Sequence, residues 1–207
     1  NRRGVEARSL LTTLNNFDID ESLLAGITGR ILLIERNFSA AIPKLRQQYV
    51  ATPNSNNATF LAFALEGNDQ KNEAIELLEQ FTAKEEAANN VHPRVSLGLA
   101  NLYLSQDKSK AIKEYEKLIS VQANNIVALN NLSWLYMEEN KYLKALEYSK
   151  QAYGINSEIP NVVDTYAQAL LKSGNKVEAL SKAQEAYKLS KGLNIDIALN
   201  LAETLLA

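Results

Sequence analysis

The residue types that most often carry chemistry are sparse in this sequence. The chain has no Cys and a single His, His92, which stands directly before Pro93. A metal centre or a catalytic triad needs several converging groups, so a lone His before Pro favours a turn residue over a ligand. Gly26 and Gly29 lie in a helical pattern with no strand before them, so they cannot cradle a phosphate. We expect no enzyme activity, no metal and no cofactor.

Charge limits the class of partner. Lys and Arg number 22 against 24 Asp and Glu, a net charge of −2, which is far from the basic balance that favours a nucleic-acid partner. The carboxylates spread over helix faces without forming a converging pair. The densest acidic stretch, residues 69–86, fits a solvated helix face, and a docking site for a basic partner is the alternative.

The compartment stays open from the sequence. No apolar run approaches the ~20 residues of a membrane-spanning helix, so we expect no membrane insertion of this segment. The absence of Cys fits a reducing compartment or a bacterial periplasm. A first residue other than Met and no secretion-signal pattern predict an excised fragment.

A helical pattern recurs along the chain with a nearly constant period. An Ala followed by apolar residues on one helix face recurs at positions 7, 41, 74, 111, 145 and 179. Successive anchoring alanines therefore lie about 34 residues apart, with one longer interval between Ala74 and Ala111. A second helical pattern precedes each anchor, and short polar breaks separate the two patterns within a period, at 35–37, 67–69, 106–107, 139–140 and 173–175. Short links of this kind force antiparallel helix hairpins.

The period and the alternation of small and large residues resemble the tetratricopeptide repeat (TPR) family over nearly the whole chain. The clearest match is Leu129, Leu132, Ser133, Tyr136, Ala145 and Ala152, although Ser149 stands where an aromatic residue is usual. The resemblance implies an all-α fold, an α-solenoid with a right-handed superhelical path. It predicts one solenoid over 1–207, with a half repeat at 1–21, full repeats at 22–54, 55–92, 93–125, 126–159 and 160–194, and a half repeat at 195–207.

Two periods depart from the family's length. Residues 82–92 contain extra positions that lengthen a second helix or the loop after it, and the inner turn at 105–109 is one residue short. The final segment, 195–207, is rich in Leu and Ala and lacks the polar outer face of a capping helix. We therefore expect further repeats on both sides.

The resemblance also implies a binding face, because TPR proteins usually bind partners on a concave face lined by the first helices. An extended peptide suits a mixture of amides, aromatic rings and Met, since amides pair with its backbone and rings cover its apolar side chains. Placing the repeat on this chain gives the candidate residues Arg30, Thr59, Phe63, Asn101, Asn130, Trp134, Met137, Asp164 and Gln168.

Three details of this face remain open. Asn130 and Asn131 are available for a carboxylate clamp, but the accompanying lysines are missing, which argues against that mode. Phe63 and Trp134 fit either packing between repeats or an exposed ligand surface. Asp164 fits either a structural hydrogen bond or the capture of a basic peptide side chain.

The leading function hypothesis is a non-catalytic scaffold for a protein or an extended peptide, of unknown oligomeric state. A second is an assembly factor of the bacterial cell envelope, because residues 128–136 and 163–171 resemble TPR lipoproteins associated with exopolysaccharide export and PEP-CTERM sorting. A third is a regulatory TPR region of a larger enzyme.

Overall fold

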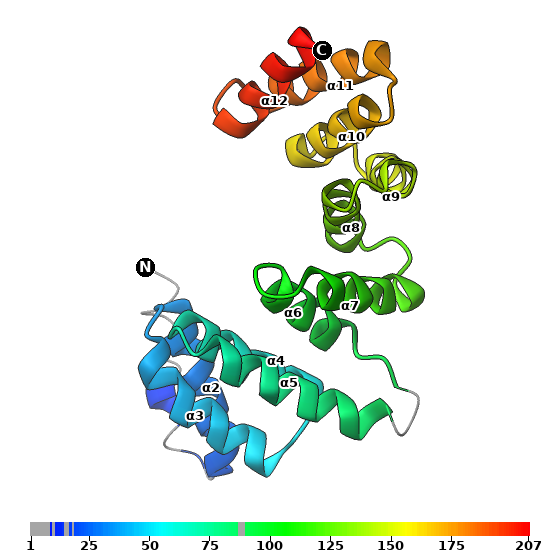
Figure 1. Ribbon diagram of the computed structural model, residues 1–207. Coiled ribbons are helices and arrows are strands. Elements are labelled where there is room, and N and C mark those ends of the chain that lie inside the picture. The colour runs from blue at the N-terminus through cyan, green and yellow to red at the C-terminus, as the bar shows by residue number, and fades with distance from the viewer. Residues whose placement is uncertain (1–8, 10, 15–16, 18, 87–89) are drawn as a thin grey trace. The chain divides into compact units, whose positions relative to one another are not determined.

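Every regular element that the structure describes is a helix, as the periodicity predicts. The computed structural model describes residues 9, 11–14, 17, 19–86 and 90–207, and Figure 1 shows their helices as successive antiparallel pairs. The predicted helix at 4–15 and its anchor Ala7 lie largely outside these residues. The described helices are α2 (Glu21–Ile34), α3 (Phe38–Ala51), α4 (Ser55–Gly67), α5 (Lys71–Glu86), α6 (Pro93–Tyr103), α7 (Lys108–Val121), α8 (Ile126–Glu138), α9 (Tyr142–Ile155), α10 (Pro160–Lys172), α11 (Lys176–Leu189) and α12 (Ile195–Leu206).

The chain divides into two compact units, residues 1–107 and 108–207. In unit 1, α2 packs on α3 and α4 packs on both α3 and α5, with α6 against α4 and α5. In unit 2, each helix from α7 to α12 packs on the next one, and the first helices α8, α10 and α12 also contact one another in sequence. Each unit is therefore a stack of helix hairpins in the α-solenoid arrangement. The division falls inside the predicted repeat 93–125.

Asparagine and proline set where the helices begin. The side chains of Asn37, Asn54, Asn125, Asn175 and Asn194 each accept a hydrogen bond from a backbone N–H in the first turn that follows. These bonds satisfy donors that a helix start otherwise leaves free. Proline opens α6 and α10, where its missing N–H costs nothing.

Four of the predicted inner turns share one backbone geometry. Each has three residues, with a positive φ at Arg36, Asp69, Asn140 or Gly174. The next residue donates its backbone N–H to the carbonyl five positions back, as in Asn37 to Leu32 at 2.9 Å and Asn175 to Leu170 at 2.9 Å. This is the Schellman motif. In α3 and α11 the donating Asn also caps the helix that follows, so one residue ends one helix and starts the next.

The link between α6 and α7 differs from the expectation of a shortened turn. It spans 104–107, four residues, and none of them has a positive φ. The shortening lies in the helix before this link, because α6 has 11 residues, whereas α4, α8 and α10 have 13. The prediction that the turn itself is short was therefore wrong.

The extra residues near position 82 lengthen a helix. α5 has 16 residues, whereas α3, α7, α9 and α11 have 14. His92 stands immediately before α6, and its ring packs edge-on against Phe81 with a centroid distance of 5.2 Å. This placement agrees with the interpretation of His92 as a turn residue.

The anchoring alanines are part of the core. All five that the structure describes are completely buried, namely Ala41, Ala74, Ala111, Ala145 and Ala179. Small residues of the first helices are buried as well, including Ala62, Ala100, Ser133 and Ala167. A Cβ added at Gly29 would lie 2.6 Å from Cγ of Leu45 and 3.2 Å from the Leu45 backbone N, so helix approach explains this glycine.

In the hairpin of α8 and α9, two buried serines donate hydrogen bonds to the same backbone carbonyl. Ser133 Oγ donates to the carbonyl of Ala145 at 2.8 Å, and Ser149 Oγ donates to the same carbonyl at 2.9 Å. Both serines are fully buried. Ser149 therefore satisfies its hydroxyl within its own helix, where the family usually places an aromatic ring.

Tyrosines link two first helices, α6 and α8, to the second helix that precedes each of them. Tyr136 Oη donates to Glu116 Oε1 at 2.6 Å, which joins α8 to α7. Tyr103 donates to Glu79 in the equivalent way, which joins α6 to α5. In α7, Tyr115 is completely buried and Asn131 Nδ2 donates to its Oη at 2.7 Å. Burial raises the pKa of Tyr115 to about 12, and the bond from Asn131 lowers it by less.

We expect Ala145→Leu to lower the free energy of unfolding of unit 2 by about 1–3 kcal/mol, because a larger side chain overpacks a completely buried position. Urea titration followed by the fluorescence of Trp134, the only tryptophan, reports on this unit. Gln151→Leu, at an exposed site of the same helix, is the control and should change stability by less than about 0.5 kcal/mol. A silent Ala145→Leu would contradict the packing described.

We expect stability to fall at high pH partly through Tyr115. Its folded pKa is raised, so the neutral phenol stabilises the fold fully below the unfolded pKa, and this contribution is lost as pH rises from about 10 toward 12. In Tyr115→Phe the slope of stability against pH in this window should be shallower by up to about 1.4 kcal/mol per pH unit. Urea titrations at several pH values measure both slopes, and equal slopes would refute the assignment.

Candidate functional site

The predicted binding residues lie on first helices, and seven of the nine line two cavities. Thr59, Phe63 and Asn101 line a cavity in unit 1, and Trp134, Met137, Asp164 and Gln168 line a cavity in unit 2. Arg30 and Asn130 line neither. The two cavities are called the unit 1 pocket and the unit 2 pocket below, and each is described by itself.

The unit 1 pocket has a volume of about 520 Å³ and an apolar wall. Phe63 is 52% exposed and packs edge-on against Phe38 with a centroid distance of 6.0 Å. Gly98 leaves the wall open, because only Leu78 would approach an added Cβ closely. The lining residues are Thr59, Ala62, Phe63, Glu66, Leu78, Arg94, Leu97, Gly98, Asn101 and Leu102. Polar groups at Glu66, Arg94 and Asn101 accompany the apolar wall.

Arg30 is held by an aromatic ring of the next first helix. Its guanidinium carbon lies 5.5 Å from the ring centroid of Phe60, a distance at which a cation is attracted by the ring face. Phe60 belongs to α4, so this contact joins α2 to α4 within unit 1.

The unit 2 pocket has a volume of about 400 Å³ and is more polar. Its lining comes from α8, α9, α10 and α12 and from the turn before α9: Trp134, Met137, Glu138, Asn140, Tyr142, Asp164, Thr165, Gln168, Lys172 and Asn200. Asn130 lies one turn before Trp134 on α8. Its Oδ1 is buried and has no hydrogen-bond donor among the described residues.

Asp164 is buried, and only one of its two carboxylate oxygens accepts a hydrogen bond from the described residues. The residue is 9% exposed, and its Oδ2 accepts a hydrogen bond of 2.7 Å from Asn200 Nδ2 on α12. Its Oδ1 is buried and finds no donor among the residues that the structure describes. Burial raises the pKa of Asp164, the bond from Asn200 lowers it, and the nearby charge of Asp196 raises it again. The structural hydrogen bond expected as one alternative is present, and it uses only one of the two oxygens.

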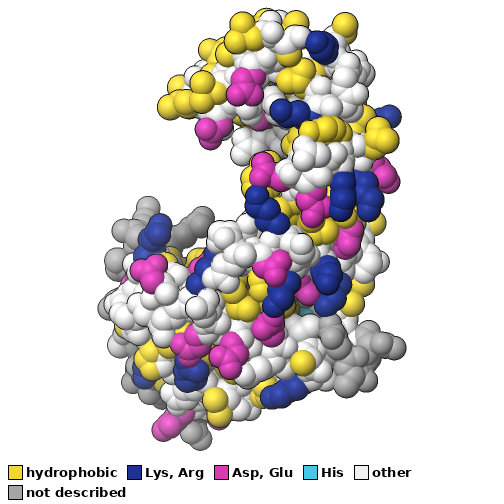
Figure 2. Space-filling view, viewed as in Figure 1, with side chains coloured by type: hydrophobic (Ala, Val, Ile, Leu, Met, Phe, Trp, Pro, Cys, Tyr) yellow, Lys and Arg dark blue, Asp and Glu magenta, His cyan; other side chains and the backbone are white. Residues whose placement is uncertain are grey.

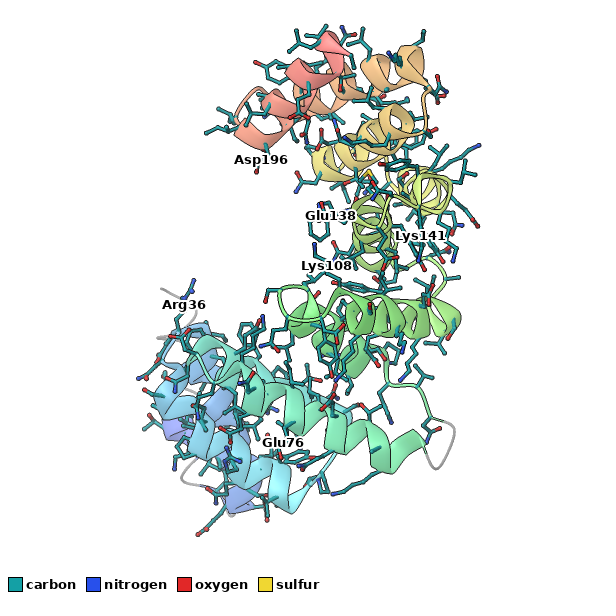
Figure 3. The ribbon with its side chains drawn as sticks, in the orientation of Figure 1. Arg36, Glu76, Lys108, Glu138, Lys141 and Asp196 are labelled. Carbon is teal, nitrogen blue, oxygen red and sulfur yellow. The ribbon has the colours of Figure 1, made fainter. Side chains whose placement is uncertain are left out.

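Trp134 presents its ring to a cation. It is 43% exposed, and Lys108 Nζ lies 5.4 Å from the ring centroid. The same Nζ pairs with Glu138 Oε2 at 2.8 Å, and Figure 3 shows the two side chains pointing toward one another. Both rings are partly exposed. Phe63 also packs against Phe38 of the preceding repeat, so packing between repeats and exposure both hold for it.

Several lining residues were not identified from the sequence. Leu97 stands one period before Asn130, at the same register, and the repeat could have indicated it. Lys172 likewise stands one period after Glu138. Asn200 has the register of Thr165, because α12 begins 35 residues after α10, and neither of these two lining residues was among the predicted ones.

The first-helix face of α12 is apolar instead. Ile195, Leu199 and Leu206 point outward and are 76%, 58% and 89% exposed. Figure 2 shows hydrophobic side chains gathered over this helix. They occupy the positions of Pro160, Asp164 and Leu171 in α10. An exposed Leu199 on α12 thus stands where α10 has the buried Asp164.

Metal ligands do not cluster in the described ranges: no group of three or more His, Cys, Asp or Glu side chains that could hold a metal ion occurs there. Within the same part of the chain, no helix is long and apolar enough to cross a membrane.

Comparison with known proteins identifies the fold. No family model matches the chain, and no curated protein matches its sequence. Solved structures do match. A MamA fragment from Desulfovibrio magneticus RS-1 has a TM-score of 0.72 and 13% identity, covering 84% of this chain and 97% of that one. A structure titled MamA AMB-1 has a TM-score of 0.67 and 22% identity, covering 86% and 96%. A third MamA structure has a TM-score of 0.69 and 18% identity, covering 83% and 92%.

These similarities agree with the all-α repeat fold predicted from the sequence. At such low identity they concern architecture and carry no assignment of partner or pathway. The chain has the fold of a TPR-type helical solenoid, as the MamA structures do.

Proposed function

We propose that this protein is a non-catalytic scaffold that binds a protein or an extended peptide along the first-helix face of its repeats. The observation that carries the proposal is the grouping of seven predicted residues into two cavities on first helices, each containing a half-exposed aromatic ring. Aromatic residues in partly open pockets are the side chains that most often dominate the energy of a protein interface.

The chemistry of the two pockets suits an extended chain. In the unit 1 pocket, Phe63, Leu78 and Leu97 supply an apolar wall for a side chain. In the unit 2 pocket, Asn140, Gln168 and Asn200 supply amides that can pair with a peptide backbone. Exposed Leu199 and Ile195 add apolar area on α12. Each pocket therefore offers a surface for an extended peptide within its own unit, the unit 1 pocket for an apolar side chain and the unit 2 pocket for a polar stretch.

An envelope-assembly role is a second proposal. It is favoured by the likeness of residues 128–136 and 163–171 to TPR lipoproteins of exopolysaccharide export and PEP-CTERM sorting. A regulatory TPR region of a larger enzyme is a third proposal. The complete reading frame separates them: a signal peptide with a lipid-accepting Cys supports the envelope role, and a fused catalytic domain supports the regulatory one.

Selection of 12-residue peptides from a random library against the immobilised protein tests the leading proposal. We expect peptides with micromolar dissociation constants by calorimetry. Phe63→Ala or Trp134→Ala should weaken the binding of a peptide that uses the corresponding pocket by about 1–2 kcal/mol, because each ring offers exposed apolar area.

Matched controls lie on second helices. Val50 of α3 is 75% exposed and Leu143 of α9 is 81% exposed, so Val50→Ala and Leu143→Ala remove apolar area outside both pockets. These variants should bind as the parent does. The proposal is refuted if no peptide is selected, or if the control variants weaken binding while Phe63→Ala and Trp134→Ala do not.

A further inference from the structure

We propose that the unit 2 pocket receives a cationic side chain, Arg or Lys, of the bound partner, with Asp164 as its anionic anchor and Trp134 as a wall. The inference rests on the proposed function and specifies the ligand chemistry of one of its two pockets. It follows from an unsatisfied acceptor, the local charge and an accessible ring.

The unsatisfied acceptor is Oδ1 of Asp164. A buried carboxylate oxygen without a donor lowers the stability of the folded protein, and such groups are rare in native structures. Here Asp164 is one of the residues that line a cavity of about 400 Å³. Its other oxygen is already bonded to Asn200, so the side chain is fixed in place. A guest that brings N–H donors into this cavity would supply what Oδ1 lacks.

A second acceptor lies at the equivalent position of the neighbouring first helix. Asn130 precedes Asp164 by one period, and α8 and α10 are in contact. Its Oδ1 is also buried without a donor in the described part of the chain. Asn130 lies outside the lining of the pocket, so the donors of a guest are assigned to Asp164 alone. A guanidinium carries five N–H donors in a planar fork, whereas a carboxylate guest carries none.

The charges around Asp164 favour a cationic side chain of the partner over an anionic one. Asp196 is close enough to raise the pKa of the Asp164 carboxyl, and burial acts in the same direction. Glu138 of the lining is paired with Lys108, which leaves Lys172 as the cation that the lining itself contributes. A cationic guest relieves the repulsion between Asp164 and Asp196, and an anionic guest increases it.

Trp134 and Met137 supply the remaining walls. The Trp134 ring already has the Lys108 ammonium at 5.4 Å, so a cation can reach its face. A guanidinium stacks on such a ring while its edge donates to a carboxylate. Met137 is a flexible apolar side chain that can cover the methylene stem of the guest.

The experiment uses the whole chain and peptides selected as above. For each peptide that contains Arg, a partner peptide carries citrulline at that position, which keeps the shape and removes the charge. Binding is measured by calorimetry and by the fluorescence of Trp134, the only tryptophan, which lies in the pocket. The variants are Asp164→Asn and the control Glu147→Gln, which removes an exposed carboxylate on α9.

We expect citrulline to weaken binding to the parent protein about tenfold or more, because a desolvated charge pair is lost. Asp164→Asn should weaken the Arg peptide by a similar factor and bind the Arg and citrulline peptides almost equally. Glu147→Gln should keep the parent's preference for Arg. Asp164→Asn should melt at or above the parent temperature, since it removes a buried charge, which separates lost binding from lost folding.

The two proposals fail in different ways. If no peptide binds, the scaffold function itself is refuted. If peptides bind and depend on Trp134, but citrulline substitution and Asp164→Asn leave their affinity unchanged, the scaffold function holds and the cation pocket is refuted. Preferential selection of peptides with a carboxylate that requires Lys172 would also overturn the cation pocket.

Discussion

The close approach of helices at buried alanines is the constraint on which the rest of this protein depends. Helices of 11 to 16 residues are too short to persist alone in water, so they must bury one face against neighbours. An Ala with no exposed surface is the fourth residue of each described second helix, and its small side chain allows a neighbouring helix to approach closely. Because helix pairs of this kind recur within each unit, the outward face of the first helices also recurs at a fixed register. Side chains at that register are left available for a partner.

The sequence was sufficient to predict the helices, the anchors and most turns. The repeat period has one physical origin here, a hairpin joined by a short link, and the positive φ at Arg36, Asp69, Asn140 and Gly174 occurs where polar residues interrupt the apolar pattern. The shortened α6 was not predicted. A deleted residue can be removed from a helix end or from a turn, and local sequence does not distinguish them.

The binding residues were predictable in part, for a related reason. Register alone places Trp134 and Asp164 on the first-helix face, and both line the unit 2 pocket. Register does not reveal hydrogen-bond partners. Asn200 was missed because its register, that of Thr165 in α10, was not among the predicted binding positions, and its amide donates to Asp164. The division of the chain at 107 and 108 likewise depends on packing throughout each unit.

The most direct test of the central claim is carbene footprinting of the whole chain with and without a selected peptide. The account predicts that labelling falls on first-helix side chains such as Phe63, Trp134 and Leu199, and that exposed side chains of second helices, such as Leu143 and Val177, keep their labelling. Protection confined to second helices, with the first-helix residues labelled as in the free protein, would contradict it.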